Sequence, residues 1–420
     1  RASLAEHFTQ NSAARLADAS YTLALGRTAR PERVAVVARS PQEAVERLKS
    51  ASVGARRSAT RPPRVAFSFP GQGAQYVEMG KNLYESEALF RLTVDECAEI
   101  LRPGLGRDLR ELLYPKGDHE AAARALRETE VTQSALFTIE IALARTLQSW
   151  GIEPSFLIGH SVGEFVAACL AGVFDLSAGL RLVRSRGHFM QEMPTGSMLS
   201  VRGSADTLLG ILPAELDLAA ENAEGLSVVA GPTADIERFA AELEARGLPG
   251  RLLETSHAFH SRAMDAAVPR FREEVARVAL QAPRMRIVST ATGTWLTDEQ
   301  AQDPDYWASH LRQPLRFSSA LATLLETRAD NPDETNLVLL EVGPRKTLTT
   351  LASQRRTGPT ATPAVAFSTL SDRADDDAEW TNLLEALGRL WTHGVPVDFR
   401  SFFRGERRRR IPLPGTSFEP

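Results

Sequence analysis

The residues with the clearest chemical potential are Gly159-His160-Ser161-Val162-Gly163, a serine with a glycine two positions away on each side. An apolar run over 155–158 precedes this motif, and small residues over 164–171 follow it. A strand that turns directly into a helix needs glycines for close backbone approach and leaves the serine Oγ exposed at the helix N-terminus. The pattern predicts a nucleophile elbow with Ser161 as nucleophile. The alternative is a glycine-rich turn whose serine only caps the helix.

A serine nucleophile needs a base, and four histidines lie near glycine or serine turns: His160, His257, His260 and His310. Its position in the serine-containing stretch 256–261 and its order in the chain favour His260. In α/β folds with a nucleophile elbow, the histidine base follows the serine in the sequence.

An oxyanion hole beside such a nucleophile needs two preorganised backbone donors. The N–H of Val162, directly after the nucleophile, supplies one, and Gln72 in the loop Gly71-Gln72-Gly73 is the candidate for the other. This loop lacks the full G-x-G-x-x-G or Walker pattern, so a nucleotide site is not indicated.

The elements that must position these residues alternate between strand and helix. Strands are predicted at 65–69, 285–290 and 337–342, and helices from the loop at 70–73 to about Trp150, at 321–327 and at 377–392. Interruptions of the helices are expected at Pro103-Gly104 and at 115–117. The alternation predicts a parallel sheet covered by helices. Strands at 198–201, 226–230 and 248–254 around a helix at 235–246 predict a compact insertion over 196–256.

The first 62 residues are expected to form a small α+β unit. It has a helical start through Leu16, a strand at 33–38 and a helix at 41–49, whose start carries Ser40 and Glu43 as a capping box. The run Arg61-Pro62-Pro63 marks its end.

Composition excludes several classes of partner. A chain of 420 residues suits two or three domains, and a net charge of -4 gives no general attraction to nucleic acid or anionic membranes. Its two cysteines have no metal-site spacing, no apolar run reaches 18 residues, and neither a metal nor a membrane is expected. A cytoplasmic location is expected. The start without a methionine or leader suggests a piece of a longer protein.

Six ordered motifs together resemble the malonyl-CoA:acyl carrier protein transacylase family, and most closely the acyltransferase domains of modular polyketide synthases. They stand at 71–75 (GQGAQ), 132–137 (TQSALF), 159–164 (GHSVGE), 186–187 (RG), 257–260 (HAFH) and 341–344 (EVGP). The resemblance spans nearly the whole chain. It implies an α/β-hydrolase-like core with an inserted ferredoxin-like subdomain, beside the small α+β unit at the N-terminus.

The resemblance also implies a domain division. Residues 1–62 match a ketosynthase-to-acyltransferase linker domain, 63–195 and 257–345 the two parts of the acyltransferase core, 196–256 the subdomain, and 346–420 a post-acyltransferase linker.

The implied reaction is ping-pong acyl transfer. Ser161 attacks the thioester of an acyl-CoA while His260 takes its proton, and the phosphopantetheine thiol of an acyl carrier protein then cleaves the acyl-serine. A backbone carbonyl in the 310–316 stretch, rather than an acid, is expected to orient His260. The implied partners are the carrier protein, the ketosynthase and other domains of a parent synthase, and no cofactor is bound by the domain itself.

The resemblance assigns the substrate pocket as well. Arg186 is expected to bind the free carboxylate of a malonyl-type substrate through two N–H groups, with Gln133 and His160 as further pocket residues. His257, Phe259 and Val162 are expected to favour malonyl over methylmalonyl, because Phe259 fills the space of a C2 methyl group. Arg345, where histidine or glycine is commoner, and the stretch at 289–293 depart from the family pattern.

Three alternatives stay open at this stage. The same machinery could select methylmalonyl-CoA. A serine thioesterase or hydrolase would use the same elbow but pair His260 with an acid, for which Glu254 or Asp235 could serve by their order in the chain. A noncatalytic docking module is the third alternative.

Overall fold

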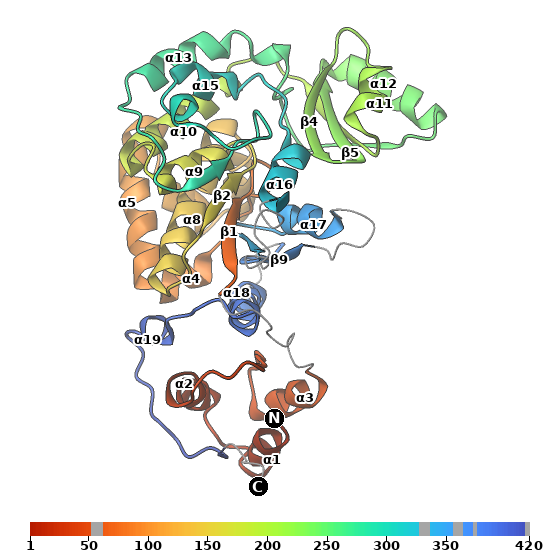
Figure 1. The fold of residues 1–420 in the computed structure, drawn as a ribbon. Coiled ribbons are helices and arrows are strands. Elements are labelled where there is room, and N and C mark those ends of the chain that lie inside the picture. Colours follow the sequence, from red (N-terminus) through yellow and green to blue (C-terminus); the bar gives the residue numbers. More distant parts are fainter. Residues whose placement is uncertain (52–61, 327–336, 356–363, 373–375, 416–420) are drawn as a thin grey trace.

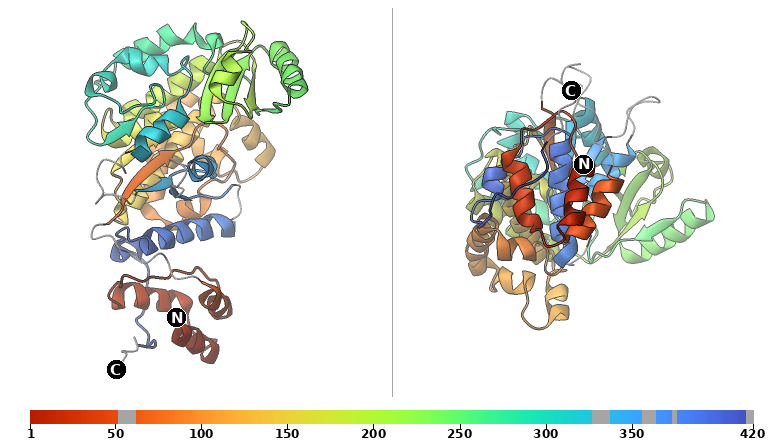
Figure 2. Two further views of the ribbon diagram at one scale, coloured as in Figure 1. Left: turned by 45° about the vertical axis from the view of Figure 1, so that its right-hand side comes forward. Right: turned by 90° about the horizontal axis from the view of Figure 1, so that it is seen from below.

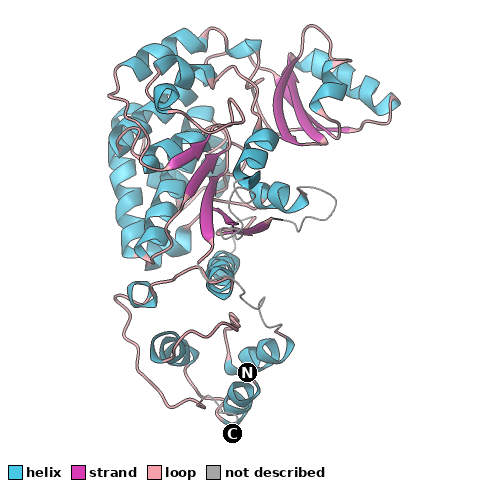
Figure 3. Ribbon diagram, viewed as in Figure 1, coloured by secondary structure: helices cyan, strands magenta, loops and turns pink. Residues whose placement is uncertain are grey.

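A parallel five-stranded sheet forms the centre of the larger part of the molecule (Figures 1 and 3). The computed structural model describes residues 1–51, 62–326, 337–355, 364–372 and 376–415. The strands are β1 (Arg64–Phe69), β2 (Phe156–Gly159), β7 (Arg286–Val288), β8 (Leu337–Glu341) and β9 (Val365–Ser368), in the order β7-β2-β1-β8-β9. All neighbours in this sheet are parallel. The expected mixed α/β fold with a parallel sheet is confirmed.

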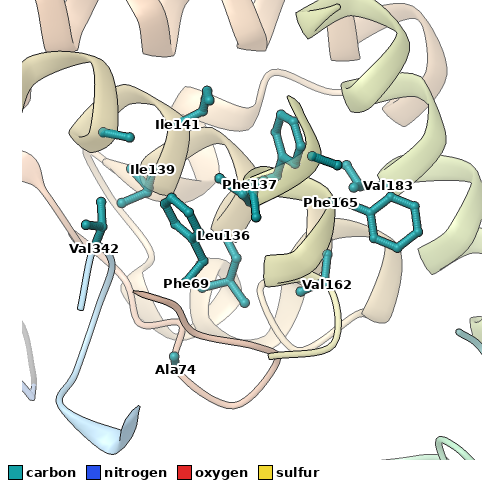
Figure 4. Close-up of a cluster of buried hydrophobic side chains, with 14 of the residues drawn as sticks. Phe69, Ala74, Leu136, Phe137, Ile139, Ile141, Val162, Phe165, Val183 and Val342 are labelled. Carbon is teal, nitrogen blue, oxygen red and sulfur yellow. The ribbon is translucent and has the colours of Figure 1, made fainter. Parts of the chain in front are cut away.

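Helices cover both faces of this sheet, because the strands alternate apolar side chains between the faces. In β1, Phe67 and Phe69 point into one buried cluster and Ala66 into another. Figure 4 shows part of the first cluster, where Phe69 lies beside Leu136 of the long helix α8. The main covering helices are α5 (Ala88–Leu105), α8 (Thr129–Ser149), α9 (Gly163–Ala171) and α10 (Leu176–Gln191) for the first cluster, and α16 (Phe317–Glu326) and α17 (Thr347–Gln354) for the second.

Shorter helices complete the layer: α4 (Lys81–Ser86), α6 (Leu109–Leu113), α7 (His119–Ala125), η1 (Arg262–Met264), α13 (Ala267–Ala276), α14 (Asp298–Ala301) and α15 (Pro304–Ser309). The expected interruption at Pro103-Gly104 is wrong, since α5 continues to Leu105. Proline there removes one hydrogen bond close to a helix end that Gly106 caps in the left-handed conformation.

A second, antiparallel sheet with its own core lies at one end of the first (Figure 1). Its elements run β3 (Ser197–Val201), α11 (Ala205–Leu209), β4 (Asp217–Ala223), β5 (Leu226–Gly231), α12 (Thr233–Ala245) and β6 (Gly250–Leu252), with strand order β4-β5-β3-β6. Three of its strands match predicted ones. The strand β4 was not predicted, because its alanines and acidic residues have low strand propensity and its pairing with β5 is irregular.

The N-terminal unit contains three helices and, over residues 1–51, no strand: α1 (Ala2–Gln10), α2 (Leu16–Gly26) and α3 (Pro41–Ser50). The strand expected at 33–38 is therefore wrong. Among the described residues this segment pairs with no strand, and it lies against α18 (Asp376–Thr392), where Arg33 donates to the Trp391 carbonyl over 2.9 Å. One of the two hydrogen bonds of the predicted capping box of α3 is present, since the Ser40 hydroxyl accepts from the backbone N–H of Glu43. The Glu43 carboxylate accepts from the backbone N–H of Arg39 instead of that of Ser40.

After α19 (Phe399–Phe402) the chain returns to this unit, and the segment that leads to residue 415 lies beside the N-terminal helices (Figures 1 and 2). Ile411 and Leu413 pack on the apolar cluster of the three helices. The backbone N–H of Ile411 donates to Thr22, and Arg27 donates to the carbonyl of Leu413. No helix within the described ranges has the length and apolarity that a bilayer crossing requires.

Candidate active site

The turn between β2 and α9 holds Ser161 in a left-handed backbone conformation, with φ of 53°. Both flanking glycines are required by packing. A Cβ on Gly159 would lie 2.1 Å from the backbone N of Glu164, and one on Gly163 would lie 2.3 Å from the carbonyl oxygen of Phe69. The strand, tight turn and helix match the predicted elbow, and its strain is of the kind that persists at functional positions.

Ser161 contacts His260, the histidine favoured from the sequence. The Oγ of Ser161 lies 2.9 Å from Nε2 of His260, and Nδ1 of His260 lies 3.1 Å from the carbonyl oxygen of Gln313. A carbonyl can only accept, so Nδ1 carries the proton and Nε2 is free to accept from the serine hydroxyl. Burial, together with the nearby charge of Arg186, holds the pKa of His260 well below its usual range. The imidazole is therefore neutral at neutral pH.

Arg186 of α10 reaches the same hydroxyl from another direction. Its Nη2 donates to Ser161 Oγ over 3.1 Å and its Nη1 to Oε1 of Gln133 over 2.8 Å. The side chain is 1% exposed, no carboxylate among the described residues pairs with it, and burial lowers its pKa to about 9. A buried charge without a counter-charge is costly, so this guanidinium is prepared for an anionic ligand.

The close packing of α10 on α8 positions Arg186. A Cβ on Gly187 would lie 2.6 Å from the Cα of Glu130. Glycine at this position therefore lets the two helices approach, and Arg186 and Gln133 meet between them.

The two backbone donors expected for the oxyanion are the N–H groups of Gln72 and of Val162, which directly follows Ser161. Within the described chain, the N–H groups of Gln72 and Val162 make no hydrogen bond. The Gln72 side chain is held by Gln133, whose Nε2 lies 3.5 Å from its Oε1. Val162 itself is 1% exposed and its side chain points into the core (Figure 4).

These groups surround a cavity of about 480 Å³, called the inner cavity below. Its wall includes Gln72, Gln133, His160, Ser161, Arg186, Phe259 and His260. Two predicted pocket residues are absent from that wall. Val162 lies in the core, and His257 stacks behind Phe259 with ring centroids 5.8 Å apart and bonds to the carbonyl of Gln191.

Two contacts join the antiparallel sheet to the walls of the inner cavity. His160 of the elbow has its Nε2 2.9 Å from Oδ1 of Asn222 in β4. The backbone of Leu315, two residues after Gln313, pairs with Ala219 and Glu221 of the same strand. Asn222 was not predicted as a site residue, because β4 was not predicted as a strand and an isolated asparagine has no distinctive sequence pattern.

Glu164, in the first turn of α9, is a second residue whose role was missed. Its fully buried carboxylate accepts from the N–H and hydroxyl of Thr290 and from the hydroxyl of Tyr306, and lies 3.3 Å from His310. Burial alone would raise the pKa of Glu164, but the neighbouring His310 and these hydrogen bonds lower it. The carboxylate thus fixes the elbow helix to the loop after β7 and to α15.

A serine and a histidine held by a carbonyl, beside a buried arginine, fit a site that passes an acyl group bearing an acid through a serine ester. Comparison with known families agrees, since the acyl transferase domain model matches residues 66–364. The chain belongs to the acyl transferase domain family. A model described as CurL-like, PKS C-terminal, matches residues 1–48.

Relatives of this acyl transferase domain are parts of polyketide synthases. It is 37% identical over 359 residues to a phenolphthiocerol/phthiocerol polyketide synthase protein of Mycobacterium tuberculosis, covering 84% of this chain and 23% of that protein. The chain thus spans less than a quarter of this curated relative.

Solved structures agree with this placement. The acyl transferase domain of ZmaA aligns with a TM-score of 0.87 and 35% identity, covering 98% of this chain and 94% of that one. The domain of SpnD, in complex with 2-(pent-4-yn-1-yl)malonyl, aligns with a TM-score of 0.84 and 39% identity, covering 93% and 91%. Malonyl CoA-acyl carrier protein transacylase from Burkholderia pseudomallei aligns with a TM-score of 0.60 and 27% identity, covering 69% and 96%.

Proposed function

We propose that this acyltransferase loads a malonyl unit from malonyl-CoA onto the phosphopantetheine thiol of an acyl carrier protein. The observation that carries the proposal is the buried, uncompensated guanidinium of Arg186, 3.1 Å from the hydroxyl of Ser161. A malonyl carboxylate would supply the missing counter-charge and place its thioester carbon at the serine. The names of the SpnD complex and of the bacterial transacylase support a malonyl-type acyl group.

The proposed first half-reaction forms an acyl-serine. Nε2 of His260 takes the proton of Ser161 as Oγ attacks the thioester carbonyl, and the N–H groups of Gln72 and Val162 bind the oxyanion. When the tetrahedral intermediate collapses, the carbon–sulfur bond breaks and His260 returns the proton to the departing thiolate of CoA.

The second half-reaction reverses these roles with a new thiol. His260 takes the proton of the phosphopantetheine thiol, the sulfur attacks the ester carbonyl, and the proton returns to Ser161 as the carbon–oxygen bond breaks. The carbonyl of Gln313 stabilises the protonated imidazole in each half-reaction, in the place where a hydrolase triad has an acid.

The contacts of the other candidate acids argue against the hydrolase alternative. The side chain of Glu254 is 92% exposed and lies 4.0 Å from Arg127, and Asp235 pairs with Arg238. Neither carboxylate contacts His260, whose Nδ1 contacts the carbonyl of Gln313.

Malonyl rather than methylmalonyl is proposed because Phe259 lines the inner cavity. The ring is 6% exposed and stacks on His257, which the Gln191 carbonyl and Ser256 hold in place. A C2 methyl group would need space that this fixed ring occupies, and one methyl group is worth about 1 to 3 kcal/mol of discrimination. His257 and Val162 would act on selectivity only through the residues they pack against.

The proposed domain roles follow the same resemblance. Residues 1–62 would be a linker to a ketosynthase and 346–420 a post-acyltransferase linker, in a synthase that also holds the carrier protein. The βαββαβ order of the antiparallel unit supports its assignment as a ferredoxin-like subdomain on an α/β-hydrolase-like core.

The first experiment offers malonyl-, methylmalonyl- and acetyl-CoA together, without a carrier, and reads the covalent adduct by intact mass. We expect a malonyl adduct on the wild type, none on Ser161→Ala, and a much weaker malonyl preference on Arg186→Ala. A methylmalonyl adduct would contradict the Phe259 argument and keep the mechanism. Rapid release of free acid without transfer to a carrier would favour the hydrolase.

A further inference from the structure

Backbone strain gathers around the inner cavity. Among the described residues, four that are not glycine have φ in the left-handed region: Glu78, Ser161, His260 and Arg345. Three of these, Ser161, His260 and Arg345, line the inner cavity. Strained non-glycine residues concentrate at sites where function needs the side chain. Ser161 and His260 have proposed roles, so the strain at Arg345, with φ of 68°, needs its own explanation.

The guanidinium of Arg345 uses only its Nε donor in hydrogen bonds with the described residues. Its backbone N–H donates to the carbonyl of Ser371 over 3.0 Å, and its Nε donates to the carbonyl of Ala74 over 3.2 Å. Neither of its Nη groups makes a hydrogen bond or an ion pair with another described residue, and the side chain is only partly buried. The Nε contact therefore fixes the direction of the side chain and leaves the outer fork of the guanidinium available to a ligand.

Arg345 stands where two cavities meet. A second cavity of about 770 Å³, called the outer cavity below, lies next to the inner one and shares Gln72, Gly73, Glu254, Thr255 and Arg345 with it. Ser161 lines only the inner cavity. A long ligand that reacts at Ser161 and extends into the outer cavity must pass Arg345.

Arg345 is the fixed cation between the two cavities. Arg127 also lines the outer cavity, where it lies 4.0 Å from Glu254, and Arg251 lines the inner one. The acids on the two walls are Glu254 and Glu120, both highly exposed. Screening by water weakens the effect of these exposed acids and of the exposed Arg127 alike, whereas the guanidinium fork of Arg345, fixed by its Nε contact, matches the geometry of phosphate oxygens.

We infer that Arg345 binds the phosphate at the end of the pantetheine arm of the acyl donor and acceptor. The inference rests on the proposed function. Phosphopantetheine is a linear chain with the reacting sulfur at one end and a phosphate ester at the other, so sulfur at Ser161 directs the phosphate toward the outer cavity. CoA and a carrier protein carry the same phosphate ester, and one arginine serves both half-reactions.

The test compares three malonyl donors in single-turnover acylation of Ser161, read by intact mass: malonyl-CoA, malonyl-4′-phosphopantetheine and malonyl-pantetheine, which lacks the phosphate. Arg345→Gln should lower the acylation rate at limiting donor about tenfold for the two phosphorylated donors. It should leave malonyl-pantetheine unchanged. Arg345→Lys should recover part of the loss, because it keeps the charge without the fork.

Arg345→Gly tests the strain separately, since glycine adopts this φ freely. We expect it to raise the melting temperature while showing the same loss with phosphorylated donors as Arg345→Gln. The matched control is Arg277→Gln, which removes an exposed arginine at the C-cap of α13, outside the walls of both cavities, and should change no donor's rate.

The two sources of phosphate are separated in the second half-reaction. Malonyl-Ser161, formed from malonyl-pantetheine, is offered phosphopantetheine, pantetheine or a holo carrier protein. If Arg345→Gln lowers the transfer rate only for phosphopantetheine and the carrier protein, Arg345 also binds the phosphate of the carrier arm. If the variant transfers to these thiols at the wild-type rate, Arg345 binds only the phosphate of CoA, which would overturn the shared site.

Equal losses for all three donors would overturn the inference and assign Arg345 to positioning the Gln72 loop through Ala74. Unchanged rates for all donors would overturn it as well. Absence of any malonyl adduct on the wild type would instead be a failure of the proposed function.

Discussion

Arg186 shows at the scale of a single residue how burial creates selectivity. The guanidinium keeps its proton at neutral pH, since burial lowers its pKa only to about 9. In the described chain its hydrogen-bond partners are Ser161 and Gln133, both neutral. A substrate carboxylate thus finds a charge that no protein group has neutralised, while an acetyl group leaves it unpaired.

The lowered pKa of His260 predicts the pH dependence of acylation. Burial first, and then the charge of Arg186, disfavours the protonated imidazole, so the base stays active below its usual range. We expect the rate of Ser161 acetylation by acetyl-CoA to stay constant as the pH falls through about 6.5 and to drop only below it. Rapid-quench intact mass measures this rate. Acetyl-CoA is used because it has no titrating carboxylate.

Arg186→Gln tests whether the charge of Arg186 contributes to the lowered pKa of His260. Removing the nearby charge should move the acid limb to higher pH, and an unmoved limb would contradict the coupling. The pKa of His260 is lower in the folded than in the unfolded chain, so below about pH 6.5 the unfolded chain binds more protons. The free energy of unfolding therefore decreases as the pH falls through this range. Melting temperatures at each pH therefore accompany the rates.

Phe259 gives a prediction on extender choice. Phe259→Ala opens the inner cavity next to the acyl group, and methylmalonyl loading should rise about tenfold relative to malonyl loading, within the range that one methyl group allows. Competition between the two CoA esters, read by intact mass, measures the ratio. Leu208→Ala, which opens the separate core of the antiparallel unit, should leave the ratio unchanged. An unchanged ratio in Phe259→Ala would place the selecting surface elsewhere.

At the scale of elements, the elbow depends on what lies beneath α9. The carboxylate of Glu164 holds Thr290, Tyr306 and His310, which come from the loop after β7 and from α15 and its C-cap. The turn at Ser161 can stay strained because the helix that follows it is fixed in place. These contacts hold it, and so does the close backbone packing at Gly159 and Gly163.

Glu164→Ala should lower the free energy of unfolding by about 3 to 5 kcal/mol, because it leaves several buried polar groups without a partner. Urea unfolding followed by tryptophan fluorescence measures the loss. Glu242→Ala, at an exposed position of α12, should change the free energy of unfolding by less than about 0.5 kcal/mol. Similar values for the two variants would show that the buried network is not stabilising.

At the scale of the whole molecule, the inner cavity lies between the two sheets, and contacts between them set the geometry of the site. Asp217 of β4 accepts from the backbone and guanidinium of Arg262, two residues after His260, and lies 3.6 Å from Arg312, next to Gln313. The antiparallel unit therefore contacts both segments that hold the base.

Asp217→Ala should loosen this connection and misplace His260. We expect acyl transfer to fall about 10- to 100-fold, as displacements near 1 Å produce, and the fraction of acyl-serine lost to water to rise. Free malonate and acylated carrier, measured in one reaction, give that fraction. Asp235→Ala, which breaks a surface pair within the same unit, is the control. A constant fraction in Asp217→Ala would contradict a role for this contact in positioning His260.

The sequence by itself determined the local chemistry of this protein. The elbow at Ser161, the order of Ser161 and His260, the capped start of α3 and the alternation of strand and helix are all short-range patterns, and glycine spacing or apolar periodicity encodes them directly. The resemblance added Arg186 and Gln133, which no local signal would have selected.

Only the tertiary structure decided which distant groups meet. The carbonyl of Gln313 on His260, the contact of Asn222 with His160, and the position of Arg345 between two cavities join elements far apart in the chain. The strand expected at 33–38 and the missed strand β4 have the same cause. A strand exists only when a partner edge is available, and that availability depends on how the whole chain packs.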